Sequence, residues 1–444
     1  MQGNAAGKKK SPVLQFVGNN VVAIIFVVFV VVGFLLTETV TLDWFLTELT
    51  NRFYRNAFLV VALIIPVICG LGMNFGITVG AMAGQLAIIL VRYYDGGGVG
   101  GMAIAALVAI AIATLFGWLV GILYNHTKGQ EMIASLIVGY FADGIYRFIL
   151  LYGVGGIIPV RPGHPLVVEP VNIGIRSTID LGGLRNSLDE VFELPFVWVL
   201  LVGAILALLW LLYGQFLRKY KPGQTKLALP RFIAYVAICL VLIGLALHTF
   251  LGNGNLDNVR GVPVAILVLI LLAILFTKWI MTTKLGQNFR ACGQDQLIAE
   301  SNGINVNKNR IIATIFSTVL GALGMLIYIQ NIGTLNVYSQ HTNIGYFSVA
   351  AILVGGASVS KATVSQAMIG TLLFNAMFIM SPEIGDAVFG QAILGEYFRT
   401  FMVYGVIGLA LGLYVWKANK AARIVLEPEE NVLDAPVKEV LKNK

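Results

Sequence analysis

The sequence predicts an all-α integral membrane protein, a polytopic bundle of about 10–12 transmembrane helices. First, 58% of its 444 residues are apolar and only 12% are charged, whereas soluble domains carry roughly 25% charged residues. Second, many uncharged stretches approach the ~20 residues that cross a ~30 Å hydrocarbon core. Third, these stretches are continuously apolar and do not alternate with the period of barrel strands, which favours helices.

Twelve apolar segments, taken in order, are the expected helices. They cover residues 19–37, 56–73, 76–92, 101–124, 131–152, 194–214, 232–251, 262–282, 310–331, 345–358, 363–381 and 399–416. The first segment follows Lys8, Lys9 and Lys10 as in a signal peptide, but no small-x-small cleavage site comes after it. We therefore expect an uncleaved first span and a single transmembrane domain over residues 1–444.

The connections between these segments differ in positive charge. With both termini cytoplasmic, every lysine lies on the inner side, as the positive-inside rule requires. The inner segments then include the N-terminus 1–18, the loop 283–309 and the tail 417–444, whereas the proline-rich stretch 153–193 is an external loop. The outer segments hold Arg52, Arg55, Arg92, Arg161, Arg176, Arg185, Arg260 and Arg399. We expect a multi-pass protein of the plasma or inner cell membrane, whose net charge of +8 reflects orientation and not nucleic-acid binding.

The sequence contains no catalytic or metal-binding constellation. Its four histidines are scattered, and its three cysteines form no disulfide or metal-ligand pattern. The segment 355–363 partly resembles a phosphate-binding loop, but Ser360 precedes Lys361 and Ala362 follows it, where such a loop has Gly and then Ser or Thr. We therefore expect no metal, no cofactor and no ATPase site or other enzymatic activity in this chain.

The uncharged run from residue 56 to residue 91 has an unusual length. It would measure roughly 54 Å as a continuous helix, which is too long for one crossing and short for two. Gly72, Gly76, Gly80 and Gly84 recur at every fourth position. This pattern has two interpretations: a broken helix that lines a translocation path, or close helix packing through a glycine face.

Asp143 and Arg147 stand four residues apart in the segment 131–152 and can form an ion pair on one helix face. A charge inside a span faces protein or water and is a functional candidate. A mutually satisfied structural pair is the alternative that we favour.

The inner loop 283–309 predicts a short, rigid helix. Asp295 can cap its N-terminus, and Gly303 can end it in a left-handed turn. A helix of about two turns on the cytoplasmic surface is suited to docking into a groove of another protein and transmitting its motion. An ordinary interhelical connection is the plainer alternative.

This loop resembles the coupling-helix region of permeases from the ATP-binding-cassette importer family for ribose, other simple sugars, nucleosides and branched-chain amino acids. The similarity falls on Gly286, Arg290, Ala291, Gly293, Ala299, Gly303 and Ile304. Shorter similarities lie at residues 74–77, 129–133 and 345–356, so that the resemblance covers 56–152 and 262–416. The chain departs from the nucleoside branch at Thr78-Val79-Gly80, and 194–251 forms an additional predicted hairpin.

The resemblance implies a permease subunit that imports a small polar solute, a nucleoside or a simple sugar, through a bundle bearing a cytoplasmic coupling helix. It also implies three partners: a cytoplasmic ATPase that uses the ATP, a second identical or related permease, and an extracytoplasmic solute-binding protein. We expect Asn74, Thr78, Gln85 and Asn375 to line the pathway. The alternative is a secondary transporter or channel driven by an ion gradient, in which Asp143 would act.

Overall fold

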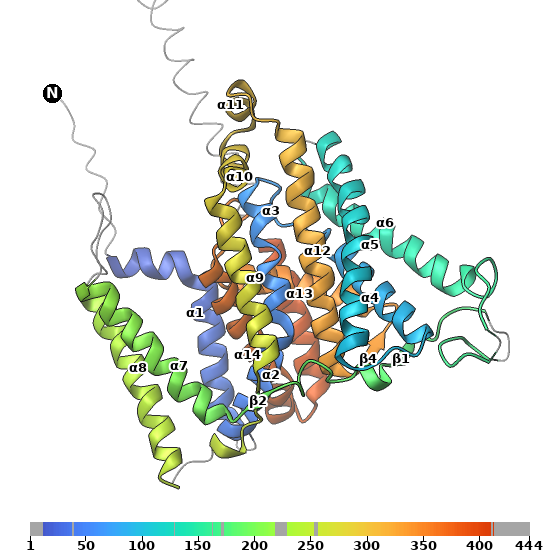
Figure 1. Ribbon diagram of the computed structural model, residues 1–444. Coiled ribbons are helices and arrows are strands. Elements are labelled where there is room, and N and C mark those ends of the chain that lie inside the picture. Colours follow the sequence, from blue (N-terminus) through green and yellow to red (C-terminus); the bar gives the residue numbers. More distant parts are fainter. Residues whose placement is uncertain are drawn as a thin grey trace, which may run out of the picture.

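The computed structural model describes residues 12–37, 40–127, 129–161, 163–169, 173–217, 229–252, 256–409 and 412. Figure 1 shows that helices dominate this part of the chain. The longer helices are α1 (Pro12–Leu36), α2 (Leu42–Val61), α4 (Ile77–Tyr93), α5 (Gly98–His126), α6 (Glu131–Phe148), α7 (Phe196–Leu212), α8 (Leu229–Phe250), α9 (Val264–Thr282), α10 (Lys284–Gln294), α12 (Val306–Ile332), α13 (Gln340–Val354) and α14 (Val364–Phe389). Two short helices are α3 (Ile64–Ile68) and α11 (Gln296–Ser301), and a further helix spans Ala392–Leu409.

Nine helices among the described residues are long and apolar enough to cross a membrane. Two shorter apolar helices, Val22–Leu36 and Ile77–Tyr93, accompany them. Each of the twelve predicted segments contains a helix, so the predicted fold class is confirmed. The predicted N-terminus 1–18 is described only from Pro12, and the predicted tail 417–444 lies outside the described residues.

The helix is interrupted inside the bundle between α2 and α4, as the broken-helix interpretation predicts. Pro66 lies in α3 and cannot donate a backbone hydrogen bond. Gly70 and Gly72 then adopt positive φ angles of 80° and 72°, a region that side chains disfavour. The Asn74 side chain accepts a hydrogen bond from Gly76 N at 3.0 Å. These features end one helix and start the next without exposing the backbone to lipid.

The predicted second segment began at residue 56, whereas the helix begins at Leu42, and the candidate span covers Leu42–Ile68. Arg52 and Arg55 therefore lie within α2 and not in a connection between helices. Glu48 lies on the same helix and forms an ion pair with Arg52. Because the charges compensate one another inside the protein, a helix can continue through residues that a hydropathy pattern assigns to water.

Close backbone packing, the second interpretation of the glycine run, is also present. A Cβ atom at Gly84 would lie only 2.7 Å from the carbonyl oxygen of Ala322 in α12, and one at Gly80 would overlap Thr318 O. On α5, a Cβ at Gly121 would lie 2.9 Å from the Cα of Ile311 in α12. The central helix α12 thus packs directly on the backbones of α4 and α5, as small residues allow in membrane bundles.

The two ends of the bundle carry different structures (Figure 1). Helices α10 and α11 form one end, which we call the α11 end. At the opposite end, β1 (Thr178–Asp180) pairs antiparallel with β4 (Thr334–Asn336), with Ile179 opposite Leu335. There β2 (Glu193–Leu194) also pairs with β3 (Val262–Pro263). The last part of the predicted loop 153–193 lies against α12, since Gln330 Nε2 donates to Asp189 Oδ1 at 2.7 Å.

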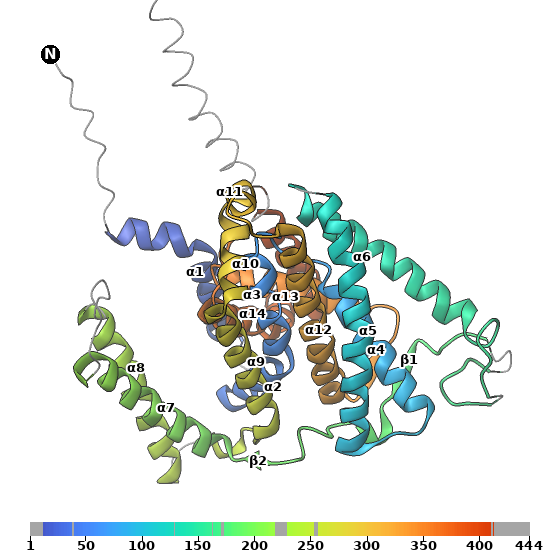
Figure 2. The same ribbon diagram turned by 45° about the horizontal axis from the view of Figure 1, so that its top comes forward.

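Helices α7 and α8 form a hairpin that extends away from the central bundle in both views (Figures 1 and 2). Its side chains are largely exposed, including Leu206, Trp210 and Leu240. A helix that presents apolar side chains on its outer faces suits contact with lipid acyl chains. This hairpin corresponds to the additional predicted segment 194–251.

Candidate functional site

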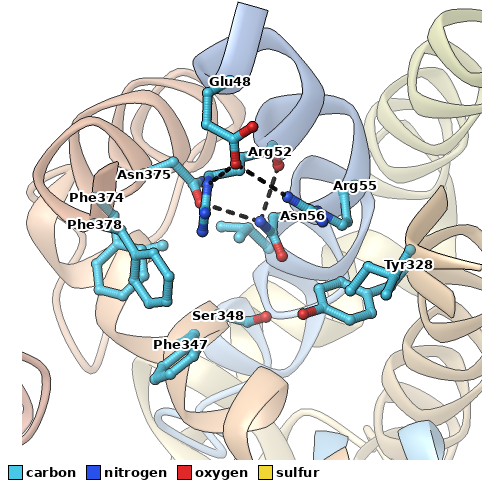
Figure 3. A pocket seen from close by; sticks show the side chains of 13 residues that line it. Glu48, Arg52, Arg55, Asn56, Tyr328, Phe347, Ser348, Phe374, Asn375 and Phe378 are labelled. Atoms are coloured by element: carbon cyan, nitrogen blue, oxygen red, sulfur yellow. Dashed lines mark hydrogen bonds and ion pairs between the residues drawn. The ribbon is translucent and has the colours of Figure 1, made fainter. Parts of the chain in front are cut away.

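A polar cavity of about 270 Å³ lies between α2, α12, α13 and α14 (Figure 3). It is lined by Glu48, Arg52, Arg55, Asn56, Val60, Tyr328, Ile332, Phe347, Ser348, Ala351, Phe374, Asn375 and Phe378. The lining residues of α2 precede the helix break, and those of α12 are in its last turns, so the cavity is nearer the β1–β4 end. A space of this size is close to the lower end of the range for small-molecule sites, roughly 300–1,000 Å³.

Charged side chains form one wall of the cavity. Glu48 Oε1 accepts a hydrogen bond from Arg52 Nε at 2.7 Å and lies 4.0 Å from Arg55 Nη2. One carboxylate therefore faces two guanidinium groups. The Arg52 guanidinium also lies 4.8 Å from the ring centroid of Phe378, and that of Arg399 lies 3.7 Å from it. Such cation–π contacts hold the aromatic ring in position beside the cavity.

Amide and hydroxyl groups complete the lining. Asn56 Nδ2 donates to Asn375 Oδ1 at 3.1 Å and joins α2 to α14 across the cavity. Asn375 Nδ2 donates in turn to Thr371 O at 2.7 Å. Arg55 Nε is buried and has no acceptor among the described protein atoms. A solute with hydroxyl or carbonyl oxygens could supply the acceptor, and the rings of Phe347 and Phe374 offer apolar faces.

The four predicted pathway residues are all buried, but the structure separates them. Asn375 lines the cavity. Asn74, Thr78 and Gln85 lie away from it and make hydrogen bonds within the protein. Asn74 Oδ1 accepts from Tyr124 Oη at 2.8 Å, Thr78 Oγ1 donates to Phe75 O at 3.0 Å, and Gln85 Oε1 accepts from Tyr146 Oη at 2.8 Å. A role of all four in the pathway stays a prediction.

The predicted short helix is present as α11, and it projects beyond the bundle (Figure 1). The Asp295 side chain accepts a hydrogen bond from Ile298 N at 3.0 Å, which caps its N-terminus. Gly303 follows with φ of 77°. Leu297 and Ile298 lie at its surface with 79% and 60% of their area exposed. A rigid helix therefore presents two adjacent apolar side chains outside the bundle.

The seven residues of the predicted coupling motif do not form the exposed apolar surface of α11. A Cβ at Gly293 would overlap Ile68 O, and one at Gly286 would overlap Ile280 O. Ala299 is buried, Ala291 and Ile304 are partly buried, and Arg290 and Gly303 are exposed. The motif thus fixes α10 against the break after α3. It does not by itself identify a contact surface.

Sequence reasoning missed two sets of residues. Leu297 and Ile298 lie in the predicted loop 283–309. Two adjacent apolar residues in a short, otherwise polar helix were the sequence signal that could have identified this surface. Of the cavity residues, Arg52 and Arg55 were assigned to an outer connection, and Asn56 was taken as the start of the second span. Their spacing of three and four residues on one helix face was the signal that could have placed them together.

Residues 45–411 match the family model described as branched-chain amino acid transport system / permease component. The xylose transport system permease protein XylH of Haemophilus influenzae is 26% identical over 317 residues, which cover 70% of this chain and 73% of that protein. The nucleoside ABC transporter permease protein NupB of Lactococcus lactis is 31% identical over 291 residues (56% of this chain, 77% of that protein). The guanosine ABC transporter permease protein NupQ of Bacillus subtilis is 24% identical over 240 residues (47% and 71%). No solved structure matches the chain at comparable significance.

Proposed function

The chain belongs to the family of branched-chain amino acid transport system permease components, and we propose that it forms the membrane pathway for an uncharged, hydroxyl-rich solute, a nucleoside or a simple sugar. The family assigns it as a permease subunit of an ATP-binding-cassette importer. The cavity between α2, α12, α13 and α14 is the proposed solute site within this pathway. The proposed coupling partner at the α11 end is a separate ATPase.

The chemistry of the cavity supports a solute of this class. Amide, hydroxyl and guanidinium groups can form hydrogen bonds with several solute oxygens, and aromatic rings can cover the apolar face of a sugar or base. The relatives are named for xylose, guanosine and nucleosides, which share a pentose or a ring rich in polar atoms. A branched-chain amino acid would instead bring an aliphatic side chain and two charged groups.

The observation that carries the proposal is the exposed apolar pair Leu297–Ile298 on α11. Adjacent apolar side chains on a projecting helix are typical anchors for a groove in a partner protein. With the lysines on the inner side, the α11 end and both termini face the cytoplasm, where ATP is available. In this arrangement the ATPase subunit binds and hydrolyses ATP, while this chain provides only the pathway.

Two further partners follow from the same proposal. A second permease, identical or related, completes the pathway, and an extracytoplasmic binding protein delivers the solute at the β1–β4 end. ATP binding and hydrolysis then shift the permeases between outward-open and inward-open states, because the ATPase binds these two states with different affinities.

Co-purification with the ATPase tests the α11 contact. Leu297→Asp places a charge at the exposed tip, and we expect loss of the ATPase subunit from the complex purified in mild detergent. Asn307→Asp is the control because it adds the same charge at an exposed position of the α11 end, in the first turn of α12 and outside the apolar pair. Retention of the ATPase by Leu297→Asp would refute α11 as the contact.

Uptake by reconstituted vesicles separates the importer from an ion-driven secondary transporter. We expect uptake to require ATP and the ATPase subunit, and to be unchanged when proton and sodium gradients are dissipated. Uptake by the chain alone along an ion gradient would favour the alternative, with Asp143 as the first residue to replace.

A further inference from the structure

Arg310 is a fully buried arginine at the α11 end of the bundle. It lies in the second turn of α12, and only 1% of its side chain is exposed. Its Nη2 atom donates to Glu131 Oε1 at 2.6 Å and to Tyr124 O at 2.7 Å. Its Nη1 atom donates to Gln296 Oε1 at 3.3 Å. One guanidinium therefore contacts the first residue of α6, the C-terminal end of α5 and the first residue of α11.

A charge in this position constrains the groups around it. A buried guanidinium without partners is strongly unfavourable, so its acceptors must remain in place or move together with it. The rigid, planar arrangement of its donors also fixes the direction of each neighbour. Since α11 joins α12 through only four residues, Asn302 to Asn305, any displacement of α11 acts directly on this joint.

Helix α6, the third element at the joint, is loosely packed elsewhere. An apolar gap of about 280 Å³ separates it from α4 and α5. Ile137 and Phe141 are 62% and 70% exposed. In Figures 1 and 2, α6 diverges from α5 with increasing distance from the α11 end. Because this gap leaves α6 with few contacts on the side that faces α4 and α5, we expect the helix to be displaced as a unit when one of its ends moves.

Polar contacts along α6 connect it to the elements around the break and the cavity. Ser135 Oγ accepts from Phe75 N, at the break before α4, at 3.2 Å. Farther along, Asp143 Oδ1 lies 2.8 Å from Nε2 of the fully buried His341. His341 is in the first turn of α13, and α13 contributes Phe347 and Ser348 to the cavity.

We infer that Arg310 is a positioning residue for coupling: it passes displacement of α11 to α6, and α6 passes it through the Asp143–His341 contact to the α13 wall of the cavity. This inference rests on the proposed function, since it assumes that α11 is moved by the ATPase. It assigns the role to a side chain that touches neither the solute nor the ATPase. Removing Arg310 should therefore separate ATP hydrolysis from solute movement.

The experiment compares three variants of the permease, each reconstituted with its ATPase and binding protein. Arg310→Lys keeps the charge beside Glu131 but replaces the planar guanidinium, which reaches its acceptors from two nitrogens, with a single ammonium nitrogen. Arg310→Met leaves Glu131 buried without its cation and is at risk of misfolding. The double variant Glu131→Met with Arg310→Met removes both charges and restores an apolar joint, a replacement that is often neutral or stabilising. Assembly, ATP hydrolysis and solute uptake are measured for each.

We expect the double variant and Arg310→Lys to assemble with the ATPase and to hydrolyse ATP within about twofold of the wild-type rate. Solute uptake per ATP hydrolysed should fall about tenfold, which is within the usual range of coupling between sites. Asn125→Ala is the matched control, because Asn125 Nδ2 donates to Asn307 O at 3.0 Å and links α5 to α12 without contacting Arg310. This control should retain wild-type coupling.

The outcomes distinguish the inference from the proposed function. Wild-type uptake per ATP in the double variant would overturn the inference, because an apolar contact between the helices would then transmit the displacement without Arg310. A parallel loss of assembly, hydrolysis and uptake in both Arg310→Lys and the double variant would also overturn it, since Arg310 would be a folding residue alone. If the wild-type chain itself shows no ATP-dependent uptake, the proposed function fails first.

Discussion

Two arginine–carboxylate pairs in different halves of the bundle have nearly the same geometry and very different surroundings. Arg310 and Glu131 are 2.6 Å apart, with 1% and 9% of their side chains exposed. Arg52 and Glu48 are 2.7 Å apart, with 25% and 31% exposed. The distance between the charged atoms therefore does not predict how much stability is lost when one partner is removed. Burial decides this loss, because a buried charge without its partner cannot be solvated by water.

The difference suits the two pairs to different tasks. The buried pair at the α11 end must move together with the helices it joins. The pair in the cavity borders open space and can exchange a protein partner for water or a solute oxygen at small cost. Substitution of the arginines at these and neighbouring positions tests this contrast.

The largest expected effect is on folding stability. Arg310→Met should lower the free energy of unfolding by about 3–5 kcal/mol, because it leaves the Glu131 carboxylate buried and unpaired. Arg52→Met should lower it by less than about 1 kcal/mol, because Glu48 keeps access to the cavity. Unfolding of both variants in the same detergent measures the difference. Equal losses would contradict the contrast.

An intermediate effect is expected on solute binding. Arg55→Met removes the buried Nε donor that lacks an acceptor, and we expect the affinity for the transported solute to fall at least about tenfold, or 1.4 kcal/mol. Arg92→Met is the control, because Arg92 is at the β1–β4 end but outside the cavity, where its Nε donates to Asp180 O. Calorimetry with the purified complex measures both. Equal affinities for Arg55→Met and wild type would remove the cavity from the pathway.

The smallest effect is expected for the third pair, Asp143–Arg147. Arg147 is 44% exposed, and the pair spans one helical turn. Arg147→Met should change the free energy of unfolding by about 0.5 kcal/mol or less, since His341 still contacts Asp143. A loss comparable to that of Arg310→Met would show that exposure does not order these pairs.

Two local features were predicted from sequence in detail. The cap of α11 by Asp295 and the positive φ at Gly303 were both expected and are both present. The run 56–91 had two interpretations. The helix break is present between α3 and α4, and close packing of Gly80 and Gly84 on α12 is present as well. A role of the broken helix in lining a translocation path stays a prediction. These signals are local because capping and positive φ involve residues only a few positions apart.

The cavity could not be predicted in the same way. Its contact between Asn56 and Asn375 joins residues 319 positions apart, and nothing in either local sequence specifies the other. Arg52 and Arg55 were misassigned to an outer connection because hydropathy counts each charge as if it faced water. Only the folded neighbours, Glu48 and Phe378 among them, show how those charges are accommodated inside a span.

The sequence by itself determined the membrane class, the approximate helices and the short capped helix α11, because these depend on composition, continuous apolar runs and contacts within one or two turns. The tertiary structure alone decided which polar groups meet across the bundle. It brought α2, α12, α13 and α14 around one cavity and placed Arg310 among α5, α6 and α11. The physical reason is that the partners of these groups lie on other helices, and the separation of two residues along the chain does not determine their distance in the folded bundle.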